Sequence, residues 1–142
     1  MKARIGVVVS RFNAEITSKL RDHCLKTLRD NGIAPKRLRV IEVPGGYELA
    51  WAVQELALSK RYGVLIALGC ILKGSTPQND HIARSVIQHL HDITLATRVP
   101  VLLGVITPRT HAQALARAQG ALDRGREAAE AALEMVCLRK AL

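Results

Sequence analysis

The stretch GCILKGSTPQND, residues Gly69–Asp80, joins the end of an apolar strand to the start of a helix through a short turn of Gly, Ser and Thr. The apolar run that feeds it, Val64–Leu72, is typical of a strand buried on both faces of a sheet. In open α/β sheets, ligands bind outside the carboxyl ends of the strands, and a turn of free backbone N–H groups before a helix suits a phosphate or a carboxylate. The stretch therefore favours an α/β fold with an anion-binding turn.

The individual residues of the turn fit this interpretation. Gly74 lets the backbone approach an anion closely, while Ser75 and Thr76 add hydroxyl donors. Lys73 adds a positive charge. An ordinary strand-to-helix turn, in which Thr76 or Asn79 caps the helix, explains the same letters without any ligand. Both interpretations stay open on this stretch alone.

Outward from the turn, strands alternate with helices along the whole chain. Continuous apolar runs predict four strands, at Ile5–Ser10, Leu38–Val43, Val64–Leu72 and Val101–Ile106. Apolar periodicity and capping residues predict helices over about Asn13–Asn31, Tyr47–Ser59, Asn79–Thr97, Thr110–Gln119 and Asp123–Leu142. Asn13 is the expected cap of the first helix and Gly32 its stop. The alternation implies right-handed βαβ units, hence a doubly wound parallel sheet with helices on both faces.

The ligand crevice of such a sheet is expected where the segments after the four strands meet. These segments are Ser10–Asn13, Val43–Glu48, Ile71–Asn79 and Gly104–Pro108. The turn after the first strand reads SRFN, without the GxGxxG of dinucleotide sites, and the chain has no GxxxxGK[ST], GxSxG or HExxH motif. Nicotinamide and nucleoside triphosphate cofactors are disfavoured, and the histidine spacing predicts no metal site.

Composition narrows the class further. A length of 142 residues with 49% hydrophobic content predicts one domain over residues 1–142. The sequence shows no secretory or membrane-spanning segment, so we expect a soluble, cytoplasmic protein with no membrane partner. The three cysteines are widely spaced and form no CxxC pair, so they are expected to be buried or incidental thiols.

A net charge of +9 raises the possibility of nucleic-acid binding. The basic residues are spread through the chain, however, and aromatic residues make up only 3%, too few for base-stacking platforms. We therefore expect no nucleic-acid partner, and attribute the charge to a solvated surface or to attraction of anionic substrates.

Five segments, in this order and spacing, resemble the 6,7-dimethyl-8-ribityllumazine synthase family. They are VVVSRFNAEIT (Val7–Thr17), VPGGYEL (Val43–Leu49), ALGCILKGSTP (Ala67–Pro77), VPVLLGVIT (Val99–Thr107) and AALEM (Ala131–Met135). The resemblance implies an enzyme of riboflavin biosynthesis that condenses 5-amino-6-(D-ribitylamino)uracil with 3,4-dihydroxy-2-butanone 4-phosphate without a cofactor. It also implies a flavodoxin-like three-layer α/β/α fold, homopentamers or larger shells with sites between subunits, and riboflavin synthase as a partner.

The resemblance assigns roles to residues of the expected crevice. Phe12 would stack on the pyrimidinedione ring, while Glu48 and the backbone around Gly46 and Tyr47 would bind the ribityl hydroxyls. Gly74, Ser75 and Thr76 match the phosphate turn, and Arg117 of a neighbouring subunit matches the phosphate-binding arginine. The remaining implied substrate contacts are Asn13, the backbone of Ile71 and Leu72, Lys73, Leu103, and Arg124, which stands where the family carries a lysine. Without the resemblance, Phe12 reads as a core residue and Arg117 as a solvated one.

Several positions depart from the family pattern. Gln78 replaces a histidine thought to move protons, and a glutamine side chain cannot titrate. Leu103 replaces an aromatic residue that closes over the pyrimidine. The segment between Ala118 and Arg124 is one residue shorter than usual. The family's N-terminal strand is expected to be almost absent before Ile5, which makes closure into a larger shell less favoured.

His81 is a candidate substitute for the missing histidine. If the helix begins near Pro77 or Gln78, the side chains of Gln78 and His81 fall on one face about a turn apart, and both are candidate catalytic residues. The alternative is that His81 only fills a position in the first helical turn. An alternative for the whole chain is a catalytically weakened relative that binds a flavin or lumazine or serves in assembly.

Overall fold

The computed structural model describes residues 4–142 and contains a single sheet of four parallel strands within that range. The strands are β1 (Arg4–Ser10), β2 (Leu38–Val43), β3 (Tyr62–Cys70) and β4 (Val101–Ile106). Their order across the sheet is β2-β1-β3-β4. The predicted four-stranded parallel sheet is therefore confirmed, and its two edges are β2 and β4.

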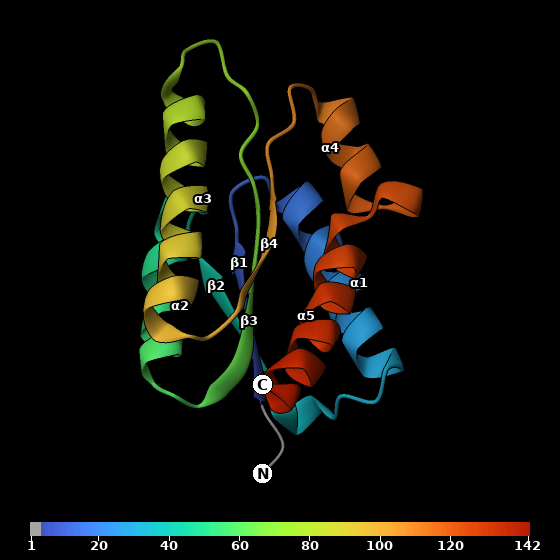
Figure 1. Cartoon of the computed structure of the whole chain (residues 1–142). Coiled ribbons are helices and arrows are strands. Elements are labelled where there is room, and N and C mark those ends of the chain that lie inside the picture. The colour runs from blue at the N-terminus through green and yellow to red at the C-terminus, as the bar shows by residue number, and fades with distance from the viewer. Residues whose placement is uncertain (1–3) are drawn as a thin grey trace.

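Five α-helices cover the two faces of the sheet. They are α1 (Ala14–Asp30), α2 (Leu49–Leu58), α3 (Gln78–Thr97), α4 (His111–Ala118) and α5 (Arg124–Ala141). In Figure 1, α2 and α3 lie on one face, and α1, α4 and α5 lie on the other. This arrangement confirms the three-layer, flavodoxin-like α/β/α fold, because helices that follow parallel strands must return over one face or the other.

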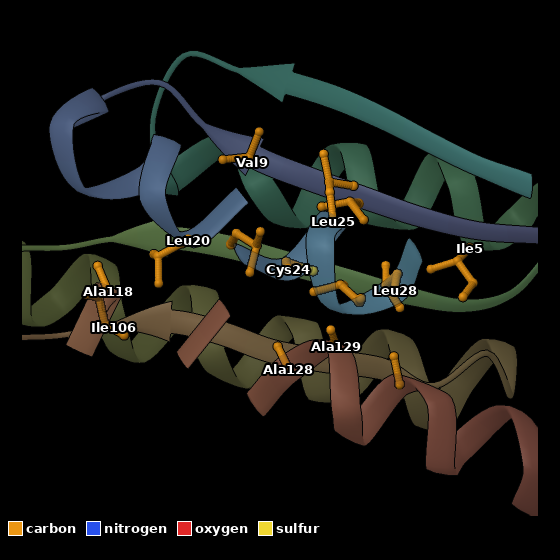
Figure 2. Packing of buried hydrophobic residues seen from close by; sticks show 14 of the residues in the cluster. Ile5, Val9, Leu20, Cys24, Leu25, Leu28, Ile106, Ala118, Ala128 and Ala129 are labelled. Carbon is orange, nitrogen blue, oxygen red and sulfur yellow. The ribbon is translucent and has the colours of Figure 1, made fainter. Parts of the chain in front are cut away.

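The layer between the sheet and α1 and α5 is built from one apolar face of each element. Along α1, Ile16, Leu20, Cys24 and Leu28 recur at helical spacing and are buried. Figure 2 shows side chains of β1, α1 and α5 gathered in this layer. From α5 come small residues, Gly125, Ala128, Ala129 and Ala132, all buried. Small side chains here let α5 lie close to α1.

The opposite layer has the same construction. Four residues of α3 at helical spacing are buried against the sheet: Ala83, Val86, Leu90 and Ile93. Leu49 and Val53 of α2 join them. Both faces of β3 are thus covered, which explains why its sequence is continuously apolar.

Most element boundaries lie within one residue of the predictions, but two elements and one predicted cap differ from them. The strand predicted at Val64–Leu72 is β3, Tyr62–Cys70, shifted by two residues at each end. The second helix opens with a 3₁₀ turn, Gly46–Glu48, before α2 begins at Leu49. Asn13 precedes α1, but its side chain makes no capping bond, since the residue is left-handed with φ 62°. Its amide points instead to another strand, as described below.

Other local predictions hold. Asp30 is the last residue of α1, and Gly32 follows with φ 89°, a value that only glycine adopts easily. Cys24 and Cys70 are buried free thiols, and Cys137 is exposed. Within residues 4–142 no helix is both long and apolar enough to cross a membrane. The expectation of a missing N-terminal strand concerns residues before Arg4, outside the described range.

Candidate active site

The topology creates a crevice between the carboxyl ends of β1 and β3. From β1 the chain first goes to β2 on one side and later to β3 on the other, so the connections leave the sheet in opposite directions at this point. A cleft of about 580 Å³ opens there. Its lining comes from the segment after β1, the segment after β2 and the segment from Cys70 to Ile82. Three of the four predicted segments therefore converge.

The fourth predicted segment, Gly104–Pro108, does not line the cleft. It comprises the end of β4 and the two residues after it, and β3 lies between β4 and β1. Neighbouring strands are about 4.8 Å apart, so the end of β4 lies roughly 10 Å from that of β1. Thr107 and Pro108 line a separate hollow on the other side of the loop that follows β3.

Hydrogen bonds fix the wall formed by the segments after β1 and β2. The N–H groups of Arg11 and Phe12 donate to the carbonyl oxygens of Val43 and Pro44, at 2.8 and 3.0 Å. Asn13 Nδ2 donates to the carbonyl oxygen of Cys70 at 2.9 Å, which ties the end of β1 to the end of β3. Asn13 therefore closes the floor of the cleft rather than capping α1.

The aromatic side chains at this wall face outward. Phe12 is 69% exposed and Tyr47 is 68% exposed, and both line the cleft. Interpreting Phe12 as a core residue is therefore wrong. Gly46 lies beside them. A Cβ added at Gly46 would come within 3.0 Å of Ile71 Cγ1, so a larger residue would push the segment after β2 away from Ile71 in the loop after β3.

The loop after β3 is fixed at both ends and open in the middle. Ile71 N–H donates to the Ile106 carbonyl at 2.9 Å and Lys73 N–H to the Pro108 carbonyl at 3.0 Å. At the other end, Asn79 Nδ2 donates to the Leu72 carbonyl at 2.6 Å. Asn79 is thus an anchor of the loop, a role that the sequence did not indicate beyond that of a possible cap.

Between these anchors, the N–H groups of Gly74, Ser75 and Thr76 have no hydrogen-bond acceptor within the described chain. All three residues are exposed and precede the first turn of α3. The Thr76 hydroxyl accepts a long bond, 3.4 Å, from Gln78 N–H, so it serves the helix start as well. Free donors at a helix amino end form an arrangement that binds anions.

Gln78 and His81 lie on one face of α3. The helix begins at Gln78, so a separation of three residues brings the two side chains to the same side. Both line an apolar hollow of about 720 Å³ together with Tyr47, Thr76 and Ile82. All of these residues except His81 also line the cleft. The geometric condition set by the sequence for His81 is therefore met.

Glu48 is half-buried at the end of the 3₁₀ turn and does not line the cleft. Its Oε1 lies 3.3 Å from the position that a Cβ on Gly45 would occupy, so the carboxylate lies beside Gly45, which lines the cleft. Cys70 does line the cleft, but burial raises the pKa of its thiol to about 11. At neutral pH it is protonated and unsuited to be a nucleophile.

Besides Glu48 and His81, which lie next to the cleft without lining it, three predicted site residues lie on other elements. Leu103, 51% exposed, is on the edge strand β4 in register with Ala67. Arg117 is half-buried in the last turn of α4. Arg124 opens α5 and contacts Glu127 at 3.3 Å. The chain does not bring these three residues to the cleft that holds Phe12.

The sequence did not single out two polar side chains near these elements. Ser10, at the end of β1, is 1% exposed and its hydroxyl has no partner in the described chain. Asp123 is 6% exposed; its Oδ1 accepts from the N–H groups of Gly125 and Arg126, and its Oδ2 lies 2.6 Å from His23 Nδ1. A buried carboxylate was not expected at Asp123, which reads simply as the start of a helix.

Fold and cleft together define a class, that of flavodoxin-like α/β proteins with a crevice between β1 and β3 and free N–H groups at its rim. The sequence model of the 6,7-dimethyl-8-ribityllumazine synthase family matches residues 2–140. A 6,7-dimethyl-8-ribityllumazine synthase of Protochlamydia amoebophila (strain UWE25) is 38% identical over 138 residues, 96% of this chain and 80% of the relative. The chain belongs to the 6,7-dimethyl-8-ribityllumazine synthase family.

Among solved structures, a de novo designed Rossmann fold protein superposes with a TM-score of 0.46 at 19% identity, covering 78% of this chain and 90% of the designed one. Family membership identifies the enzyme as a transferase of riboflavin biosynthesis. It condenses 5-amino-6-(D-ribitylamino)uracil with 3,4-dihydroxy-2-butanone 4-phosphate. The alternative of a relative that only binds flavin or lumazine is not favoured.

Proposed function

We propose that the condensation takes place in the cleft between β1 and β3, and that a second copy of the chain completes the site. The observation that carries this proposal is the pairing of two features in one cleft. An exposed aromatic ring, Phe12, stands at one wall, and three free N–H groups, at Gly74–Thr76, lie at the other. One suits a flat heterocycle and the other suits a phosphate.

The pyrimidinedione substrate would occupy the wall formed after β1 and β2. Its ring would stack on Phe12, and its edge would meet backbone groups of Ile71 and Leu72. The ribityl chain would run along Gly46 and Tyr47 toward Glu48. The fixed backbone supports this placement, because a rigid wall loses little entropy when a ligand binds.

The phosphate of the second substrate would bind at Gly74–Thr76. The amino end of α3 favours negative charge, and Lys73 adds a cation beside the free N–H groups. Holding the phosphate there brings the butanone carbonyl toward the ring-bound substrate. The amine then attacks the carbonyl, water leaves as the imine forms, and phosphate is eliminated, so much of the acceleration can come from positioning the reactants.

Gln78 and His81 would serve these proton transfers differently. The Gln78 amide can donate and accept hydrogen bonds but cannot exchange a proton, whereas the His81 imidazole can. His81 is exposed, with no side-chain partner in the described chain, and shares a hollow with Gln78. We assign the proton-transferring role to His81 and an orienting role to Gln78.

The location of Leu103, Arg117 and Arg124 supports a shared site. Leu103 lies on β4, the edge of the sheet away from β2, and Arg117 and Arg124 lie on α4 and α5, which pack beside α1. A neighbouring subunit that presents its β4 edge to this cleft would bring them in, with Arg117 and Arg124 as counter-charges for the phosphate. Repetition of this heterologous contact closes a ring, and we propose a homopentamer. We also propose a cytoplasmic location, because the cysteines remain thiols.

Subunit mixing tests the shared site. Phe12→Ala and Arg117→Ala would each be nearly inactive alone. In rings reassembled from equal amounts of both, about a quarter of the interfaces would pair an intact Phe12 with an intact Arg117 if subunits mix at random. We expect lumazine absorbance at about a quarter of the wild-type rate. Mass measurement must first show that the rings contain both variants. If such mixed rings are as inactive as the separate variants, the two residues do not serve one intersubunit site.

A further inference from the structure

A second hollow lies on the far side of the loop that follows β3. It measures about 690 Å³ and is bounded by the first turns of α3 and by the segment after β4. Three cationic side chains line it: Lys73 from the loop, Arg84 from α3 and Arg109 from the segment after β4. We refer to it as the basic hollow. The roles proposed above use Lys73 and leave Arg84 and Arg109 unexplained.

The charges of the basic hollow are not balanced within the chain. Asp80 is its only carboxylate, against three cations. Arg84 follows Asp80 by four residues, a spacing that commonly gives an ion pair on a helix, yet no ion pair forms between them. Within residues 4–142, none of the four side chains has a hydrogen-bond or ion-pair partner. A site with a net charge of about +2 suits a compact dianion.

The walls of the basic hollow are held by the backbone. The carbonyl oxygens of Ile106 and Pro108 accept from Ile71 and Lys73 N–H at 2.9 and 3.0 Å, which fixes the segment after β4 against the loop after β3. Arg109 N–H donates to Gln113 Oε1 at 2.8 Å, and Pro108 is buried. Only the cationic side chains need to be ordered when a ligand binds, so the entropic cost is limited to a few rotamers.

We propose that the basic hollow is a second anion site, which takes a phosphate dianion, free or as a small phosphate monoester. Arg84 and Arg109 approach it from two different elements, and guanidinium groups bind phosphate oxygens in a forked geometry. Asn79 and Thr107 add neutral polar groups to the lining. The basic hollow shares Ile71, Lys73 and Asn79 with the cleft, but Gly74–Thr76 line the cleft and not the basic hollow. The proposal does not depend on the shared-site proposal.

Titration with inorganic phosphate at constant ionic strength tests the proposal, followed by the amide resonances of the assembled protein. We expect two saturable sets of shifts, one at Gly74–Thr76 and one at Thr107 and Arg109. The double variant Arg84→Gln/Arg109→Gln should weaken phosphate binding at the second set about tenfold or more, since it removes the charge-assisted hydrogen bonds of both guanidinium groups. The first set and lumazine formation should stay at their wild-type values.

The matched control is Lys36→Gln/Arg61→Gln, which removes two exposed cations near the amino ends of β2 and β3. It changes net charge equally and should leave both sets unchanged. Titration with a small phosphate monoester such as glycerol phosphate tells whether an ester fits as well as the free anion. The proposal is overturned if Thr107 and Arg109 show no saturable shift, or if the double variant binds like wild type. Loss of lumazine formation in the double variant would show instead that the basic hollow is part of the reaction site.

Discussion

The close contact between α1 and α5 leaves no room for a side chain at Gly125 of α5. A Cβ added at Gly125 would lie 2.2 Å from the Leu20 carbonyl oxygen and 2.9 Å from the Leu20 carbonyl carbon. Ordinary contact begins near 3.4 Å. Both groups in the clash belong to the backbone, so no rotamer change relieves it, and α5 must move from α1 by about 1 Å or more.

We expect Gly125→Ala to lower the free energy of unfolding by about 3 kcal/mol, the upper part of the range for overpacked sites. The higher helix propensity of alanine, at most about 1 kcal/mol, offsets only part of this loss, because Gly125 lies in the first turn of α5. For a chain of this size the melting temperature should fall by roughly 6–12 °C. Urea unfolding at a fixed protomer concentration measures the change, because the stability of an oligomer depends on concentration.

Gly74→Ala is the matched control for this stability measurement. Its added Cβ would have only Asn79 Nδ2 nearby, at 3.6 Å, which is ordinary contact. We expect its unfolding free energy to stay within about 0.5 kcal/mol of wild type. A Gly125→Ala protein as stable as the control would refute the close approach of α5 to α1, and with it the explanation of the small residues along α5.

Further predictions concern the thiols and the proton carrier. At pH 8 an alkylating reagent should modify only Cys137 in the folded protein and all three cysteines in urea, because burial raises the pKa of Cys24 to about 12 and of Cys70 to about 11. Both values lie above the ordinary 9.0. The two thiols therefore stabilise the folded protein below pH 9, and this stabilisation is lost as the pH rises toward 11 and 12. Over that pH range the free energy of unfolding should fall more in wild type than in Cys24→Ala. His81→Ala should lower turnover about tenfold or more and flatten the pH–rate profile, and Gln78→His should restore turnover to that variant. Wild-type turnover with an unchanged profile in His81→Ala would leave solvent as the proton carrier.

The fold was predictable because the apolar pattern of each segment agrees with its burial in the structure. Continuous apolar runs mark β1 and β3, which the structure covers on both faces, and periodic apolar residues mark α1 and α3. The ends of the strands were less predictable, because pairing with a neighbouring strand decides where a strand begins and ends. Tyr62 joins β3 because it pairs with Arg4, and Leu72 lies outside β3 although it is apolar. A run of apolar letters cannot show where a neighbouring strand ends.

The site was predictable in part for a related reason. Turn chemistry identified Gly74–Thr76, and the structure leaves their N–H groups free as expected. Sequence patterns predict Asn13 as a cap and allow Asn79 as one, since asparagine beside a helix start often caps it. Each instead bonds a carbonyl group distant along the chain, Cys70 and Leu72. These hydrogen bonds depend on which strand ends lie next to each other, and the periodicity of apolar residues does not show that.

The sheet order explains why one chain would provide only part of a site. Leu103, Ala67 and Val8 are in register across β4, β3 and β1, so Leu103 lies on the face that α2 and α3 cover, but beyond α3 at the exposed edge. Arg117 belongs to α4, whose buried residues pack on the opposite face. Leu103 and Arg117 lie on opposite faces of the sheet, so they cannot both turn back across β3 to a cleft at β1. Both residues can contact the cleft of a second copy of the chain that packs against the β4 edge. An isolated protomer should therefore bind the heterocycle at Phe12 more readily than it completes the reaction.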